Sequence, residues 1–132
     1  MSQKRVPRPT EAELEILQIL WQNGPSSVRF VNDELNEERE VGYTTTLKIM
    51  QIMVEKGLAS RNTESKTHIY RAEVDEAETQ RRLLEQFVDS TFRGSAMKLV
   101  MRALGDHTAS QEELDSIKAL IKRMERHRKK EE

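Results

Sequence analysis

The sequence predicts a mainly helical protein that carries one small β-hairpin. Apolar residues recur every three or four positions over most of the 132 residues, which is the spacing of one face of a helix. Helix-capping residues and glycines mark where these segments begin and end. Only the segment from Leu58 to Val74 has the short extended stretches, flanking a polar turn, that are typical of paired strands.

The composition limits the functions that the chain can have. Cysteine is absent, which excludes disulfides, thiolate metal sites and thiol redox chemistry. The first ten residues lack the apolar core of a secretory signal, and no apolar run is long enough to span a bilayer. We therefore expect a cytoplasmic protein. A net charge of −1 still permits DNA binding, which needs only a local basic surface.

We predict that residues 1–9 form a flexible arm and that residues 10–74 form three helices followed by a hairpin. Thr10 opens a capping box for the first helix, and Gly24 with the proline after it ends that helix. Ser27 is placed to cap a short second helix, after which a polar loop leads to the third.

The third helix is predicted from Gly42 to Lys56. Two extended stretches follow it, Leu58 to Asn62 and His68 to Val74, with a polar turn between them. Three helices followed by a two-stranded hairpin is the element order of a winged helix-turn-helix domain.

Residues 75–132 predict three further helices, separated by Gly94 and by a capping box that begins at Ser110. A unit of this size buries too little apolar surface to be stable alone, and its apolar stripes are wide. We therefore predict a helical dimerisation domain that forms a homodimer with a second copy of the chain. The predicted dimerisation residues are Leu83, Leu84, Phe87, Val88, Phe92, Leu99, Val100, Leu104, Leu114, Ile117, Leu120, Ile121 and Met124.

The residue pattern of the third helix predicts one apolar, buried face and one polar, outward face. With Met50 at the centre of the buried face, a period of 3.6 residues turns Thr46 inward and Thr44, Thr45 and Lys48 outward. In a helix-turn-helix protein the first residues of the second motif helix reach base edges in the major groove. A threonine hydroxyl can bond a base or a phosphate there, and its methyl group can contact a thymine methyl.

The predicted DNA-binding residues form one set. They are Thr44, Thr45, Lys48, Gln51, Arg29 and Lys66. Arg29 lies early in the second helix, where it can hold a phosphate, and Lys66 lies at the tip of the hairpin. The alternative for the first turn is that the threonines only cap the helix and Lys48 is an ordinary solvated lysine. The outward Ile52 fits neither interpretation well.

The motifs assembled so far resemble the penicillinase-repressor family (BlaI/MecI-like transcriptional regulators). The likeness runs through PTEAELEILQILWQNGPSSVRFV and GYTTTLKIMQIMVEKGLASR, and continues in TFRGSAMKLVMRAL and SQEELDSIKALI. The resemblance implies a dimeric winged-helix repressor that binds a palindromic operator of double-stranded DNA. It also implies a helical C-terminal dimerisation domain, which a membrane sensor protease cuts in the antibiotic-responsive members.

The chain departs from this family at three places. Phe30 stands in the second-helix cap where a glutamate is common, and Ile52 stands where relatives often carry a basic or polar residue. The Asn-Phe bond that is cut in the antibiotic-responsive members would fall at Arg102-Ala103. The cysteines of the copper-responsive branch are absent.

Two other function classes remain to be weighed. An enzyme is disfavoured because the three histidines lie far apart and no metal-ligand or phosphate-loop spacing is present, so we expect no cofactor and no metal. The stronger alternative is a winged-helix module that binds protein and not DNA. That function would favour an apolar outward face on the third helix, for which Ile49 and Ile52 are the support.

Overall fold

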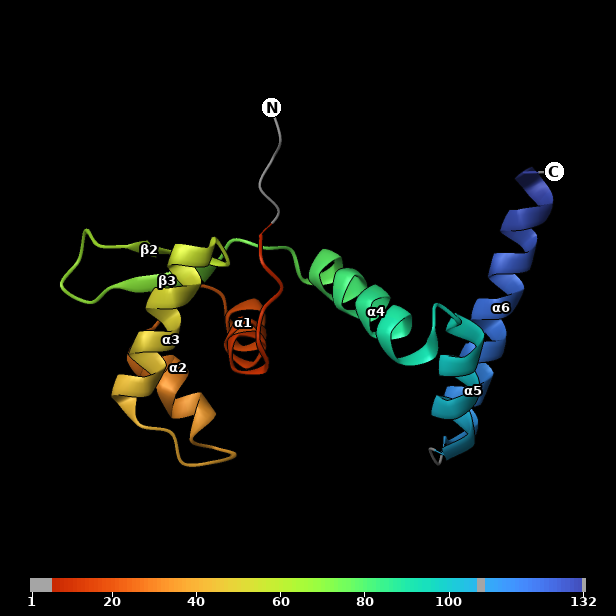
Figure 1. Cartoon of the computed structure of the whole chain (residues 1–132), viewed down its shortest axis with the longest axis horizontal. Coiled ribbons are helices and arrows are strands. Elements are labelled where there is room, and N and C mark those ends of the chain that lie inside the picture. Colours follow the sequence, from red (N-terminus) through yellow and green to blue (C-terminus); the bar gives the residue numbers. More distant parts are fainter. Residues whose placement is uncertain (1–5, 107–108, 132) are drawn as a thin grey trace. The chain divides into compact units, whose positions relative to one another are not determined.

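The computed structural model describes residues 6–106 and 109–131, and contacts divide the chain into two compact units, Met1–Leu84 and Glu85–Glu132. The elements, labelled in Figure 1, are α1 (Glu11–Asn23), β1 (Ser26–Ser27), α2 (Val28–Leu35), α3 (Tyr43–Lys56), β2 (Ala59–Asn62), β3 (Ile69–Ala72), α4 (Glu76–Phe92), α5 (Ala96–Asp106) and α6 (Gln111–Glu131). This order confirms a mainly helical fold with a small antiparallel sheet. None of the described helices is long and apolar enough to cross a membrane.

The helix ends lie where the capping residues predict them. Thr10 accepts a hydrogen bond from the amide of Glu13 at 3.2 Å, and its own amide donates to the Glu13 carboxylate at 2.9 Å. Ser27 accepts from the amide of Phe30 at 3.1 Å, which caps α2. Gly57 ends α3 at a φ of 84°, a left-handed conformation that glycine adopts without steric cost.

The sheet has three strands, one more than the hairpin that the sequence predicts. Its order is β1-β3-β2, because Ser26 and Ser27 pair antiparallel with Tyr70 and Ile69. A strand of two residues is too short to show alternation, so only the long-range pairing reveals it. We call the hairpin of β2 and β3 with its turn, Ala59–Ala72, the wing; Figure 1 shows it extending from the three helices.

The first unit has its own core. Its buried apolar side chains come from the three helices and from the base of the wing: Ile16, Leu17, Leu20, Val28, Val31, Leu35, Met50, Met53, Leu58, Ala59 and Tyr70. The Trp21 indole donates to the Val74 carbonyl at 3.0 Å, which fastens the chain after β3 to α1. This core holds α3 against α1 and α2 and fixes which face of α3 remains exposed.

The start of α4 belongs to the first unit by its contacts. Thr79 is buried, and the Arg82 guanidinium donates to the Val6 carbonyl at 3.0 Å. Val6, in the segment expected to be a flexible arm, is half-buried against the core. The predicted boundary between residues 74 and 75 is not tested by these contacts, and we keep it as a proposal.

All regular secondary structure described in the second unit is helical: it consists of the end of α4, α5 and α6. Phe87 and Phe92 pack edge to face with ring centroids 5.7 Å apart. The charged segment that begins at Lys122 is helical, because α6 continues to Glu131. The basic residues of its last turn interact favourably with the negative end of the helix dipole. Arg102 and Ala103 lie within α5, and both are exposed.

Candidate nucleic-acid interface

The outward face of α3 is polar and exposed in the structure. Thr44, Thr45 and Lys48 are exposed, whereas Thr46 and Met50 are buried. For these five side chains the helical period assigns the exposed and the buried side of α3 as the structure shows them. The contact of the three exposed side chains with DNA is not tested by this geometry and stays a prediction.

The beginning of α3 is held by two asparagines that lie outside the helix. Asn32 of α2 donates to the Thr46 hydroxyl at 2.8 Å and to the Val41 carbonyl at 3.0 Å. Asn36 donates to the same carbonyl at 2.9 Å and accepts from the Val41 amide at 3.1 Å. These bonds fix the loop before α3, and hence the direction in which the helix presents its first turn.

No side chain of the described residues caps the first turn of α3. Its N-cap is Gly42, which has no side chain to accept a hydrogen bond from the first amides. Unpaired amides and the positive end of the helix dipole favour an anion at this position. The threonines follow inside the helix and do not occupy its cap position, which weakens the alternative that capping alone explains them.

Arg29 lies over the ring of Tyr43, 5.5 Å from its centroid. A guanidinium over an aromatic face is attracted by the ring electrons and is restrained in position. The helical period counted from Met50 puts Tyr43 toward the buried face of α3, but Tyr43 is the first residue of the helix and 45% of its surface is exposed. The start of α2 and the start of α3 therefore share one cationic contact.

A hollow of about 400 Å³ lies between α3, the start of α2 and the wing. We call it the wing cleft. The residues that line it are Ser27, Val28, Arg29, Tyr43, Leu47, Gln51, Arg61, Lys66, Thr67, His68 and Tyr70. It brings together three of the predicted DNA-binding residues, Arg29, Gln51 and Lys66, whereas Thr44, Thr45 and Lys48 do not line it.

Sequence reasoning did not place Arg61, His68 and Tyr70 in one site. The register pairs Arg61 of β2 with Tyr70 of β3. Paired residues point to the same side of a sheet, and His68, which lies just before β3, also lines the cleft. The alternation of His68 and Tyr70 was the available signal, but the partner of each strand residue becomes known only with the register.

The outer side of the wing has a different arrangement. Arg71 donates to the Ser60 hydroxyl at 3.2 Å and to the Glu73 carboxylate at 3.0 Å. The hydrogen bonds from Ser60 and Arg71 lower the pKa of Glu73 below its ordinary value. The charge of Arg71 is thus partly satisfied within the protein.

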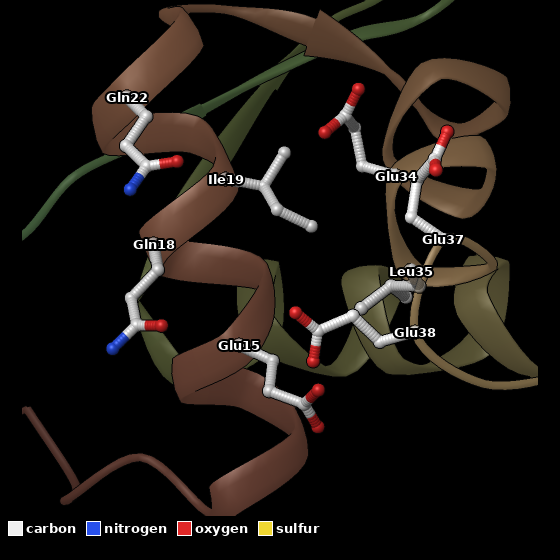
Figure 2. A pocket seen from close by; sticks show the side chains of 8 residues that line it. All are labelled: Glu15, Gln18, Ile19, Gln22, Glu34, Leu35, Glu37 and Glu38. Atoms are coloured by element: carbon white, nitrogen blue, oxygen red, sulfur yellow. The ribbon is translucent and has the colours of Figure 1, made fainter.

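A second hollow, of about 280 Å³, is lined mainly by acidic and amide side chains (Figure 2). It lies between α1 and the end of α2, and its lining residues are Glu15, Gln18, Ile19, Gln22, Glu34, Leu35, Glu37 and Glu38. Arg39 pairs with Glu15 beside it. Carboxylates repel phosphate, so this side of the first unit is not suited to DNA, and the cationic side chains of the wing cleft lie elsewhere. Within the described residues no group of three acidic or histidine side chains is placed to hold a metal ion.

The two isoleucines that supported a protein-binding face are half-buried. Ile49 packs against the core, and Ile52 is also only partly accessible. The outward face of α3 accordingly presents the threonines and Lys48 and no fully exposed isoleucine.

The predicted dimerisation residues lie on α4, α5 and α6, and most are accessible. Eight of them are exposed: Leu84, Phe87, Val100, Leu104, Leu114, Leu120, Ile121 and Met124. The other five, Leu83, Val88, Phe92, Leu99 and Ile117, are half-buried. Their contact with a second chain is not tested by the structure of one chain and stays a prediction.

Comparison with known proteins agrees with the resemblance seen in the sequence. The chain is 22% identical over 128 residues to the penicillinase repressor of Bacillus licheniformis, which covers 97% of this chain and 99% of that protein. It is 20% identical over 112 residues to the methicillin resistance regulatory protein MecI of Staphylococcus aureus strain N315, covering 85% of this chain and 91% of that protein.

Two solved structures support the fold. The solution structure of the DNA binding domain of the repressor BlaI matches with a TM-score of 0.50 at 22% identity, covering 58% of this chain and 93% of that one. A MarR family protein from Bacillus stearothermophilus matches with a TM-score of 0.50 at 17% identity, covering 93% of this chain and 77% of that one. The model of the penicillinase repressor family matches residues 9–123, and the chain therefore belongs to that family.

Proposed function

We propose that the protein is a transcriptional repressor that binds double-stranded operator DNA through the exposed face of α3. The observation that carries this proposal is the polar first half of α3, with Thr44, Thr45 and Lys48 exposed, in a chain that belongs to a repressor family. The penicillinase repressor family is a family of transcriptional repressors and not of enzymes. A repressor acts where the DNA is, so we propose a cytoplasmic location for the protein.

The geometry of α3 suits the major groove. Its side toward the protein is buried in the core, so the exposed side can enter the groove without loss of packing. Threonine hydroxyls can bond base edges, and Lys48 and the uncapped amides of the first turn can hold phosphates. Glu55, near the other end of the helix, is exposed and repels phosphate, which favours an approach by the N-terminal half.

We further propose that two chains form a homodimer through the second unit. Among the side chains described between residues 85 and 130, none is buried in the isolated chain. An apolar surface that extends over three helices without a core of its own requires a partner, and a second copy presents an identical surface. Two α3 helices related by a two-fold axis would read a palindromic operator with half-sites about one helical turn apart.

The first experiment determines whether the protein reads DNA sequence at all. The full chain is used to select duplexes from a random-sequence library, and the enriched sequence is assayed for binding. We expect enrichment of an inverted repeat. A winged-helix module that binds only protein, the alternative function, would enrich no sequence.

The second experiment tests the face of α3. Replacing Lys48 with alanine removes one phosphate contact in each half-site, so we expect weaker binding and, for the dimer, a salt dependence of log affinity that is reduced by about 2. Binding of the selected operator is measured between low and moderate salt for Lys48→Ala and for Lys98→Ala, an exposed lysine of α5 as a matched control. An unchanged affinity and slope in a folded Lys48→Ala variant would show that the proposed face is wrong.

A further inference from the structure

Residues 6–9 precede α1 and contact both the end of α3 and α4; we call them the strap. The Val6 side chain is half-buried and packs against the core of the first unit. Its Cγ2 methyl lies 3.8 Å from the position that a Cβ of Gly57 would occupy, at the C-terminal end of α3. The Val6 carbonyl accepts a hydrogen bond of 3.0 Å from the Arg82 guanidinium of α4. One residue thus joins the end of α3 to α4.

The strap is stiff, and its connection to α1 is held in place. It contains two prolines, Pro7 and Pro9, whose fixed φ reduces the conformational entropy that the segment loses on docking. The next residue, Thr10, is the N-cap of α1 and is hydrogen-bonded to Glu13. The Glu13 carboxylate also pairs with Lys56 at the end of α3. The strap is therefore fixed to the helix that it reaches at Val6 and to the helix that follows it.

The start of α4 is fastened to the first unit by further contacts. The Val74 carbonyl, just before this helix, accepts the hydrogen bond from the Trp21 indole, and Thr79 in its first turns is buried. The helix nevertheless continues to Phe92, and the division between the two units falls inside it, after Leu84. A single helix thus begins in the unit that carries α3 and ends in the unit that we propose to dimerise.

We propose that Arg82 and the strap determine which spacing of half-sites the homodimer can read. The inference rests on the proposed function, because it requires a dimer that binds operator DNA. Arg82 is a positioning residue in this proposal: it acts by holding the start of α4 against the unit that carries α3. A firmly held start of α4 restricts the distances between the two α3 helices of a dimer, which raises the effective concentration at one half-site spacing and lowers it at others.

The hydrogen bond from Arg82 is suited to this role. Its donor is charged and its acceptor is a carbonyl in a partly buried position, and charge-assisted hydrogen bonds are stronger than neutral ones. The neighbouring Arg81 provides a matched control, since its ion pair with Glu78 spans one turn of the same helix.

The test varies the spacing of the operator. Duplexes carry the two selected half-sites with the distance between them changed one base pair at a time. Each step moves one half-site by about 3.4 Å and rotates it by about 35°. A further duplex carries a single half-site. Binding is measured for the full-length wild type, Arg82→Met, Arg82→Lys, Val6→Ala and Arg81→Met, with folding checked by urea unfolding.

Wild type should bind one spacing about 10-fold more tightly than the neighbouring ones. Arg82→Met removes the donor and keeps an apolar stem, so we expect about fivefold weaker binding at the best spacing and nearly unchanged binding at the others. Val6→Ala, which weakens the other side of the same contact, should act in the same direction. Arg82→Lys retains a donor and, like Arg81→Met, should keep the wild-type profile.

The single half-site separates positioning from folding. Its affinity should stay within about twofold of wild type in every variant, because each α3 still reads its own half-site. A variant that damaged the fold of the first unit would instead weaken binding to the single half-site and to the operator alike.

A measurement without DNA tests the strap itself. Hydrogen exchange is followed at the amides of α4, of which that of Thr79 donates to the Asp75 carbonyl at 2.9 Å. We expect Arg82→Met to speed exchange in the first turns of α4 and to leave the amides of α1 unchanged, since a helix start that is less firmly held opens more often. Arg81→Met should exchange as wild type does.

Three results would overturn the proposal. They are unchanged exchange in α4 of Arg82→Met, a spacing profile of that variant as steep as that of wild type, and equal losses on the operator and on the single half-site. The repressor function would still stand in each case if Lys48→Ala weakens binding. A wild-type chain that bound every spacing equally well would overturn both this proposal and the proposed homodimer on an inverted repeat.

Discussion

Thr46 shows how one residue serves two purposes within the first unit. It is fully buried, as its position on the helix predicts, so its methyl group can pack in the core. Its hydroxyl also accepts a hydrogen bond from Asn32 at 2.8 Å, which the sequence did not indicate. A β-branched residue is a modest helix former, and this combination of packing and hydrogen bonding offsets that cost.

Replacing Thr46 with valine tests this bond at constant shape. Valine deletes the hydroxyl, and the Asn32 amide then has only the Val41 carbonyl as acceptor. We expect the free energy of unfolding to fall by about 1–2 kcal/mol in urea titration. Thr45→Val, the exposed neighbour, is the control and should change it by less than about 0.5 kcal/mol. Equal effects of the two substitutions would contradict a structural role for the Asn32 bond.

At the scale of elements, one ion pair joins the start of α1 to the end of α3. The Lys56 ammonium lies 2.8 Å from the carboxylate of Glu13, whose side chain is 4% exposed. Burial by itself raises the pKa of Glu13, but the hydrogen bonds from Lys56 and Thr10 outweigh it, so the pKa is lowered from 4.5. The same carboxylate caps its own helix and fixes α3 against α1.

Glu13→Gln should therefore destabilise the protein in a pH-dependent manner. Because the folded-state pKa is lowered, the carboxylate contributes stability above pH 4.5, and that contribution is lost as the pH falls through the folded-state value. At pH 7 we expect a loss of about 1–3 kcal/mol in urea unfolding, and a smaller difference from wild type below pH 4.5. Glu11→Gln, an exposed residue of the same turn, is the control. A difference that did not shrink in acid would show that the charge of Glu13 is not its cause.

At the scale of the whole molecule, the two units differ in how they are stabilised. The first has a core of eleven buried apolar residues, whereas none of the side chains described between residues 85 and 130 is buried. The first unit should fold alone, and the second should depend on association. Coupling two DNA-binding units through such a dimer raises their effective concentration on neighbouring half-sites.

Truncation after Gly94 tests whether the first unit folds alone and whether dimerisation requires the helices that follow. A chain of residues 1–94 should fold, sediment as a monomer and bind the operator about 10²–10⁴-fold more weakly than the full chain. The full-length variant Leu120→Glu/Ile121→Glu, which places two charges on the exposed stripe of α6, should show a similar loss. A truncated chain that remained dimeric in sedimentation would show that the dimer contact does not need α5 and α6.

The sequence alone determined most of the helical architecture, because its signals are local. Capping residues such as Thr10, Ser27 and Ser110 and the helix-ending Gly24 and Gly57 act within one turn of the chain. The 3.6-residue period likewise assigned the exposed and buried sides of α3 through residues on the same helix. Such features depend on neighbours within four positions and can be read without the fold.

The tertiary structure decided what depends on contacts between distant segments. The pairing of Ser26 and Ser27 with β3 created a third strand, and the register of Arg61 with Tyr70 placed an arginine on the wing cleft. Neither follows from periodicity, since a strand residue acquires its neighbours only when another strand is fixed beside it. The hydrogen bond that the Asn32 amide donates to the Thr46 hydroxyl also depends on a contact between two separate helices. The sequence thus determined which side of α3 is exposed, and only the packing of α2 and the wing around α3 determined which charged groups lie beside it.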